Sequence, residues 1–210
     1  MQHDKKYEKF YKQAEEVLAH QKAKDESWGE RYKEIFLAPT TLTDKDLKKL
    51  DALIKDKEVE NYTLAEKCFI LTLCCGLRFR EIVNLKRHNF IIIDGNYYIY
   101  IDRVIPFDLK LHTMMVGSID ENNDVYVLGD GKEPIDPKVI SDEVYNMFKE
   151  TGTLHENTLI SLATTLLRAE EMGKSGVEND LVEYLLRKSF ATGLYSEGCS
   201  DEKVAYFLGI

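Results

Sequence analysis

The chain has 210 residues, of which 44% are hydrophobic and 31% charged, and its formal net charge is −9 at pH 7. This size and composition predict a folded chain with a sizeable core and exclude wholesale disorder. No apolar run approaches the roughly 18 residues of a membrane-spanning helix, and the N-terminus, MQHDKKYEKFYKQAEE, lacks the apolar region of a secretory signal. We therefore predict a cytoplasmic protein without membrane contact, whose four cysteines are reduced.

The distribution of charge along the chain is uneven. Residues 61–110 carry a net charge of +2, whereas residues 111–150 carry −6. Binding to a nucleic-acid backbone needs clustered lysine and arginine, so the total charge argues against a strong nucleic-acid binder. Any contact with nucleic acid is expected to be made by the net-basic block.

Apolar residues recur at helical spacing through the first 85 residues. This spacing predicts helices over residues 5–24, from Trp28 to a stop before Pro39, from Thr43 to Ile54, over 63–75 and over 80–85. Thr43 is expected to cap its helix, because an acidic residue follows three positions later. Gly76 is expected to separate the last two helices.

The pattern changes after residue 89. β-Branched and aromatic runs flank Asp94-Gly95-Asn96 and predict a hairpin within Asn89–Asp102. Val125–Leu128 is predicted as a further strand. Helical spacing then returns over residues 138–150, 156–172, 178–196 and 201–208. The expected fold is mainly α with a small antiparallel β-sheet (α+β), with a short helical N-terminal extension at 1–40 and one domain at 41–210.

The first segment with chemical interest is Gly76-Leu-Arg-Phe-Arg-Glu-Ile82. Arg78 follows directly on an apolar helix and stands at the start of the next one, where a cation is unfavourable for the helix dipole. A cation placed there often faces an anion such as phosphate, and Lys86, Arg87 and His88 extend the basic surface. On the residues alone, a solvated charged turn between two core helices remains the alternative.

The second segment is Leu185-Leu-Arg-Lys-Ser-Phe-Ala-Thr192. Its leucines and Phe190 form an apolar helical face, and Arg187 lies beside that face. A partly buried arginine needs a carboxylate or phosphate partner. A salt bridge to Glu81 or Glu183 is therefore the structural alternative to a ligand-binding role.

Together the two segments resemble the catalytic domain of the tyrosine recombinase (phage integrase) family. That family has a box like GLRxxE after an apolar helix, then a β-hairpin, then a box like HxLRHxFAT that continues to LGH. The chain matches with GLRFREI, the hairpin at Asn89–Asp102, and LLRKSFATGLYSEGCSDEKVAYFLGI. The resemblance covers about Thr40 to Ile210.

The resemblance implies roles for particular residues. Arg78 and Arg187 would grip one phosphate of duplex DNA, since a guanidinium can donate two hydrogen bonds to phosphate oxygens. Glu81 would orient neighbouring side chains, and Lys188 would act as a cation or proton donor. Arg80, Lys86, Arg87 and His88 are expected to contact DNA. No metal or cofactor is implied, because the arginines supply the charge stabilisation, and no cofactor or zinc motif is present.

The sequence departs from the family pattern at several positions. Tyr184, Lys188 and Ile210 stand where the second box has histidines, and the hairpin lacks the lysine that the family uses as a proton donor. The nucleophilic tyrosine of the family lies about ten residues beyond the LGH histidine, so the printed sequence contains no counterpart. Tyr195 and Tyr206 have helical spacing and are expected to serve packing. The first 40 residues are also too few for the family's separate DNA-closing domain.

Three hypotheses follow for function. The first is a recombinase- or integrase-like protein that binds duplex DNA weakly and salt-sensitively, does not cleave alone, and assists a complete recombinase or associates with itself. The second is a non-catalytic regulatory or protein-interaction module that retains the fold, which the acidic residues 111–150 favour. In the third, the natural chain continues past Ile210 to a tyrosine and is an enzyme.

Overall fold

The computed structural model describes residues 3–23, 29–117, 124–173 and 180–210. In chain order its elements are η1 Lys5–Tyr7, α1 Glu8–Ala23, α2 Glu30–Leu37, α3 Asp44–Ile54, η2 Val59–Asn61, α4 Leu64–Cys75, α5 Phe79–Ile82, η3 Arg87–Asn89, β1 Phe90–Ile93, β2 Asn96–Tyr100, β3 Val104–Phe107, α6 Leu109–Val116, α7 Pro137–Glu150, α8 Glu156–Glu171, α9 Leu181–Ser196 and α10 Asp201–Leu208. The predicted fold class, mainly helical with a small antiparallel sheet, is confirmed.

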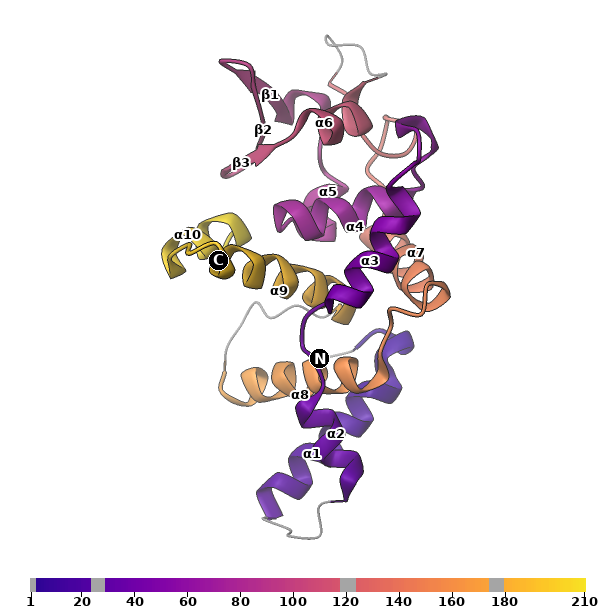
Figure 1. Cartoon of the computed structure of the whole chain (residues 1–210), viewed down its shortest axis with the longest axis vertical. Helices are drawn as coiled ribbons and strands as arrows, with labels where there is room; N and C mark the ends of the chain where they lie inside the picture. The colour runs from indigo at the N-terminus through magenta and orange to yellow at the C-terminus, as the bar shows by residue number, and fades with distance from the viewer. Residues whose placement is uncertain (1–2, 24–28, 118–123, 174–179) are drawn as a thin grey trace.

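The elements form three tiers along the long axis of the molecule (Figure 1). One end holds α1 and α2 packed against α8, and the sheet and α6 form the other end. Between them lie α3, α4, α5, α7, α9 and α10. The two N-terminal helices therefore pack against a helix from the later part of the chain. The boundary after residue 40 stays a prediction.

Helix α4 is the centre of the middle tier. Most of its residues are apolar, and most of them are buried. It packs against α7 and α9 and also contacts β3 and α5. Thr63 caps its start by accepting from the Glu66 amide, and Glu66 returns a bond to the Thr63 amide. This reciprocal cap fixes where α4 begins, and Gly76 ends it in the left-handed conformation at φ 67°.

The sheet has the order β1-β2-β3 with antiparallel pairing throughout. Asp94 and Gly95, both at positive φ, form the β1–β2 turn, as the Asp-Gly signal predicts. Ile99 pairs with Phe90 on one side and Ile105 on the other, and all three are buried. The predicted hairpin is confirmed.

Some elements differ from the sequence expectations. The prediction of a strand at Val125–Leu128 was wrong, because Tyr126 forms only an isolated bridge to Lys86. β3 and α6 were not predicted. α5 covers residues 79–82 and not 80–85. The expectations at residue 24, at Trp28 and at residues 178 and 179 lie outside the described residues.

Candidate phosphate site at the end of α4

Gly76, which directly follows α4, brings the two sequence boxes together. Arg187, on α9, donates from Nε to the Gly76 carbonyl at 3.1 Å. Arg78 follows Gly76 by two residues, so both arginines belong to one region of the molecule. A Cβ on Gly76 would lie 2.6 Å from the Phe190 ring of α9. The absence of a side chain at this position therefore lets the two boxes approach closely.

Arg187 is 3% exposed and links two helix ends. Besides the Gly76 bond after α4, its Nη2 donates to the Leu208 carbonyl of α10 at 2.6 Å. Carbonyls at helix C-termini carry partial negative charge, so they are favourable partners for a buried guanidinium. Of the two carboxylates named above as alternative partners of Arg187, Glu183 accepts from the Phe79 amide at 2.7 Å, and Glu81 accepts from Arg78 and Arg103.

Arg78 is the residue before α5 and is half-buried. Its amide donates to the Glu81 carboxylate at 2.8 Å, and the next amide, that of Phe79, donates to Glu183. Two carboxylates thus satisfy the first amides of this short helix. An incoming anion would have to be bound by the arginine side chains, because these amides already have acceptors.

Glu81 forms a bidentate ion pair with Arg103. Nη1 and Nη2 of Arg103 lie 3.0 and 3.1 Å from the two carboxylate oxygens, and Arg103 also contacts Asp102 at 2.7 Å. Burial opposes the charge of Arg103, but the bonds and charges of Glu81 and Asp102 outweigh it, so the pKa of Arg103 is raised above its ordinary value. Arg103 is the first basic residue after the hairpin that lacks the family's lysine. At 3% exposure it is a buried partner of Glu81.

Lys188 follows Arg187 on α9 and is half-buried. Its Nζ lies 5.9 Å from the centre of the Tyr184 ring, one helical turn earlier. Burial lowers the pKa of Lys188 from its ordinary value. A lysine with a lowered pKa releases a proton more readily, which is the property that a proton donor at this position would need.

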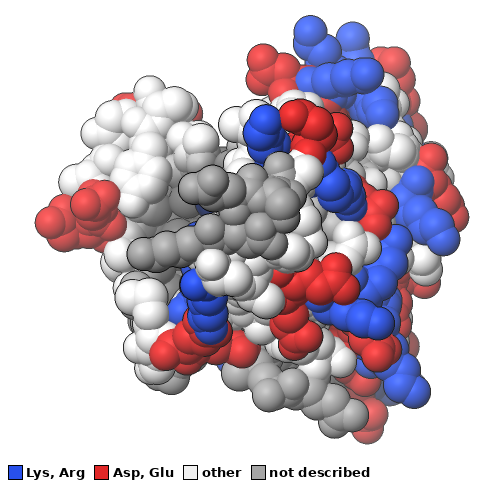
Figure 2. Space-filling view, turned by 90° about the horizontal axis from the view of Figure 1, so that it is seen from below, with Lys and Arg blue, Asp and Glu red and all other residues white. Residues whose placement is uncertain are grey.

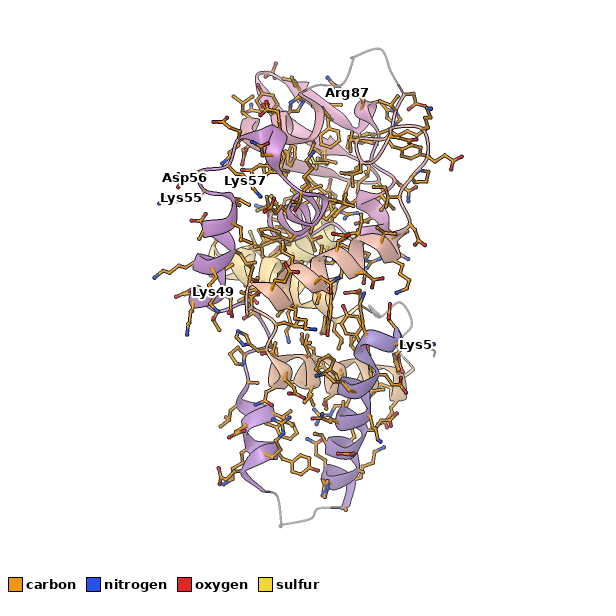
Figure 3. All side chains as sticks on the ribbon, turned by 90° about the vertical axis from the view of Figure 1, so that its right-hand side faces the viewer. Lys5, Lys49, Lys55, Asp56, Lys57 and Arg87 are labelled. Carbon is orange, nitrogen blue, oxygen red and sulfur yellow. The ribbon has the colours of Figure 1, made fainter. Side chains whose placement is uncertain are left out.

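The remaining predicted DNA contacts lie beyond α5. Arg80 is exposed. Arg87, which Figure 3 labels near the sheet end of the molecule, donates to the Phe90 carbonyl at 3.2 Å. Lys86 and His88 both contact Asp124, at 3.1 and 2.7 Å. Asp124 therefore neutralises part of the basic surface that the sequence offered to DNA.

Asp124 is held in place by backbone pairing. The Arg87 amide donates to the Val125 carbonyl at 2.9 Å, and the Val127 amide donates to the Leu85 carbonyl at 3.0 Å. The hydrogen bonds and charges of Lys86 and His88 lower the pKa of Asp124. The local excess of acidic residues after position 110 was visible in the sequence, but the pairing with residues 85–87 was not.

Other kinds of site have little support in the described part of the chain. No group of three or more metal-ligating side chains is found there, and none of the helices described is long and apolar enough to cross a membrane. Cys68 and Cys75 are buried, while Cys74 is exposed and Cys199 half-buried, and none of them forms a disulfide. A cavity of about 260 Å³ between β3, α9 and α10 is lined mainly by apolar groups, including Phe190 and Phe207, and by none of the candidate site residues.

This combination of a central helix, a three-stranded antiparallel sheet and two arginine-bearing boxes defines a class of fold. It is the fold of the tyrosine recombinase catalytic domain, and solved structures of that class match most of the chain. No protein-family model matches the sequence, and no curated protein does. The fold is therefore recognised from structure where sequence comparison finds no match.

Two solved structures illustrate the similarity. XerA recombinase matches 96% of this chain with a TM-score of 0.54 and 17% identity. XerH site-specific recombinase, bound to its difH substrate in a pre-cleavage complex, matches 81% with a TM-score of 0.56 and 20% identity. The matched regions span 66% and 47% of those two chains. At these identities the comparison establishes the fold and leaves the reaction to be argued from the site.

Proposed function

We propose that this protein is a recombinase- or integrase-like protein that binds duplex DNA at a phosphate site formed by Arg78 and Arg187. The observation that carries the proposal is the contact of Arg187 with the Gly76 carbonyl, two residues from Arg78. Two guanidinium groups from separate parts of the chain would then bind one phosphate. Planar, bidentate donors of this kind suit the oxygens of a phosphodiester.

The expected binding is weak and salt-sensitive. The chain carries a net charge of −9, and DNA affinity depends on the number of phosphates that lysine and arginine neutralise. Viewed from the end that holds α1, α2 and α8, basic and acidic side chains are interleaved and form no continuous basic field (Figure 2). Because the proposed contacts are made to phosphates, affinity is expected to fall as salt rises and to be modest at physiological salt.

We propose further that the protein does not cleave DNA by itself. Tyr184 and Ile210 stand where the family has proton-transferring histidines, and Lys188 replaces a third. Only Lys188, whose pKa is lowered by burial, retains a group suited to proton transfer. The protein would then bind DNA beside a complete recombinase or associate with a second copy of itself.

Fluorescence polarisation with a labelled duplex at low salt tests the phosphate site. Arg78→Ala is expected to weaken binding by about tenfold, since a charge-assisted contact contributes roughly 1.5–3 kcal/mol. Arg31→Ala is the matched control, because Arg31 is an exposed arginine of α2 that bonds Gln13 at 3.1 Å, and it makes the same change in net charge. Equal losses for both variants would reduce the proposal to non-specific attraction.

A duplex that traps the covalent protein–DNA intermediate of strand cleavage tests the absence of cleavage. No adduct is expected with this chain alone. An adduct mapped by mass spectrometry to any tyrosine, including Tyr195 or Tyr206, would overturn that part of the proposal. The DNA-binding part would stand, because adduct formation requires binding.

The second candidate function is a protein-interaction module that retains the fold. The contacts of Asp124 with Lys86 and His88 favour it, because they place an acidic group on the surface predicted to meet DNA. Absence of duplex binding at low salt, with Arg78→Ala indistinguishable from the unchanged protein, would favour this candidate over the first.

A further inference from the structure

Glu81 presents an electrostatic problem for a phosphate site. Its carboxylate lies 2.8 Å from the Arg78 amide, so a negative charge stands beside one of the two arginines that would hold a phosphate. An uncompensated carboxylate there would repel the ligand. The site can bind an anion well only if another group neutralises Glu81.

Arg103 supplies that neutralisation. Its guanidinium meets both oxygens of Glu81 in the bidentate geometry and is almost wholly buried, at 3% exposure. A buried ion pair is screened little by salt, so the compensation persists where surface pairs would weaken. The third nitrogen, Nε, donates to the Phe207 carbonyl of α10 at 2.9 Å.

The same guanidinium also fixes the end of α10 relative to Arg187. Arg103 holds the Phe207 carbonyl and Arg187 holds the next one, that of Leu208. The two arginines are thereby placed through adjacent peptide groups of one helix end. Displacement of Arg103 would therefore loosen the end of α10, where the Leu208 carbonyl accepts from Arg187.

We propose that Arg103 is a positioning residue of the phosphate site, which neutralises Glu81 and aligns the α10 end that holds Arg187. This inference rests on the function proposed above, and it assigns to Arg103 a role other than proton donation. The nearby chain supports the assignment. Gly209 follows α10 at φ +65°, and a Cβ there would lie 2.6 Å from Nη1 of Arg103, so the backbone leaves room for the guanidinium alone.

The test compares two variants that break the same ion pair and leave opposite charges. Arg103→Met leaves the Glu81 carboxylate uncompensated and is expected to weaken duplex binding by about tenfold, or about 1.4 kcal/mol. Glu81→Gln leaves the positive charge and is expected to bind at least about threefold more tightly than Arg103→Met. A purely structural ion pair would make both variants lose affinity alike.

The double variant Arg103→Met/Glu81→Gln gives the rescue measurement. It leaves no buried charge, and buried ion pairs replaced together are often tolerated, so its affinity is expected to recover by at least about threefold over Arg103→Met. Tyr206→Phe is the matched structural control, because it removes the 2.9 Å bond from the Val104 amide to α10 without changing charge. Its duplex affinity is expected to stay within about twofold of the unchanged protein.

Gly209→Ala keeps both charges and displaces the guanidinium, so it tests positioning if Arg103→Met does not fold. It is expected to weaken duplex binding by about threefold, with the far-ultraviolet circular dichroism retained. The inference alone fails if the unchanged protein binds duplex in an Arg78-dependent way and both Gly209→Ala and Arg103→Met bind duplex as tightly as the unchanged protein does. Absence of Arg78-dependent binding in the unchanged protein overturns both the proposed function and this inference.

Discussion

The two basic regions of this molecule hold their charges in different ways. At the end of α4, Arg187 and Arg103 are each 3% exposed and are fixed by carbonyls and by a bidentate carboxylate. In the segment after α5, Lys86 and His88 are more accessible and share the carboxylate of Asp124, which belongs to the acidic part of the chain. The arrangement at the end of α4 fixes the positions of the guanidinium groups, whereas the arrangement after α5 mainly neutralises the charge of the basic side chains.

This difference bears on which residues can define a binding site. A buried guanidinium has lost its hydration and much of its conformational freedom during folding, so it needs little rearrangement when a ligand arrives. An exposed lysine must still lose side-chain entropy and is screened by salt. The arginine region is therefore expected to control both stability and phosphate binding, and the Lys86–His88 segment only the strength of long-range attraction.

The largest expected effect is on stability at the arginine region. Arg187→Ala leaves the carbonyls of Gly76 and Leu208 without this donor, and each orphaned buried group costs roughly 1–3 kcal/mol. We expect the free energy of unfolding to fall by about 2–4 kcal/mol in urea denaturation. Lys86→Ala, the comparison in the other region, is expected to lose about 1 kcal/mol or less. Similar losses for both would remove the distinction between the regions.

The next effect concerns the glycine that joins the two boxes. Gly76→Ala introduces a Cβ 2.6 Å from the Phe190 ring at φ +67° and is expected to destabilise the fold by about 2–4 kcal/mol. Gly95→Ala is the matched control, because Gly95 also has a positive φ, of +78°, but no neighbour within 4 Å of a Cβ. It is expected to cost about 1 kcal/mol. Thermal unfolding of both variants isolates the part of the loss that comes from contact with α9.

Much of the fold could be predicted from local patterns. The hairpin was predictable because Asp94-Gly95 selects a tight turn between two β-branched runs. β3 was missed because Val104–Phe107 is short and contains a proline, and its strand character comes from pairing with β2. Val125–Leu128 has the composition of a strand, but its backbone bonds to residues 85–87 form only one bridge.

The candidate site was predictable in part. The two arginine boxes were recognisable from resemblance, and the structure brings Arg187 against Gly76 in the first box. The Arg103–Glu81 pair could not be predicted, because no periodicity links residues 22 positions apart. Asp124 was equally hidden, since it lies 38 positions from Lys86 in the sequence and meets it only because residues 85–87 pair with residues 125–127 through the backbone. Ion pairs between residues far apart in the chain leave no local pattern in the sequence.

The smallest expected effect is on duplex affinity and concerns the exposed Lys86–His88 segment. Asp124→Asn removes the carboxylate that faces Lys86 and His88, and it is expected to raise duplex affinity by about twofold to fivefold at low salt, an effect that about 0.2 M salt largely abolishes. Asp94→Asn is the control of equal charge, at the exposed hairpin turn. If both substitutions raise affinity equally, Asp124 contributes net charge only and does not mask the basic segment.

The pH dependence of the same contact gives an independent measurement. The bonds from Lys86 and His88 hold the pKa of Asp124 below its ordinary value of 3.8, so the contact contributes stability above about pH 4 and loses it as the pH falls through the lowered pKa. Carboxyl titration by nuclear magnetic resonance should therefore place the Asp124 midpoint below 3.8, and Lys86→Ala should move it upward, because it removes the hydrogen bond and the charge of Lys86. A pKa of Asp124 that Lys86→Ala leaves unchanged would mean that Asp124 does not occupy the basic segment, which would then be open to phosphate. The two basic regions would in that case differ only in their burial.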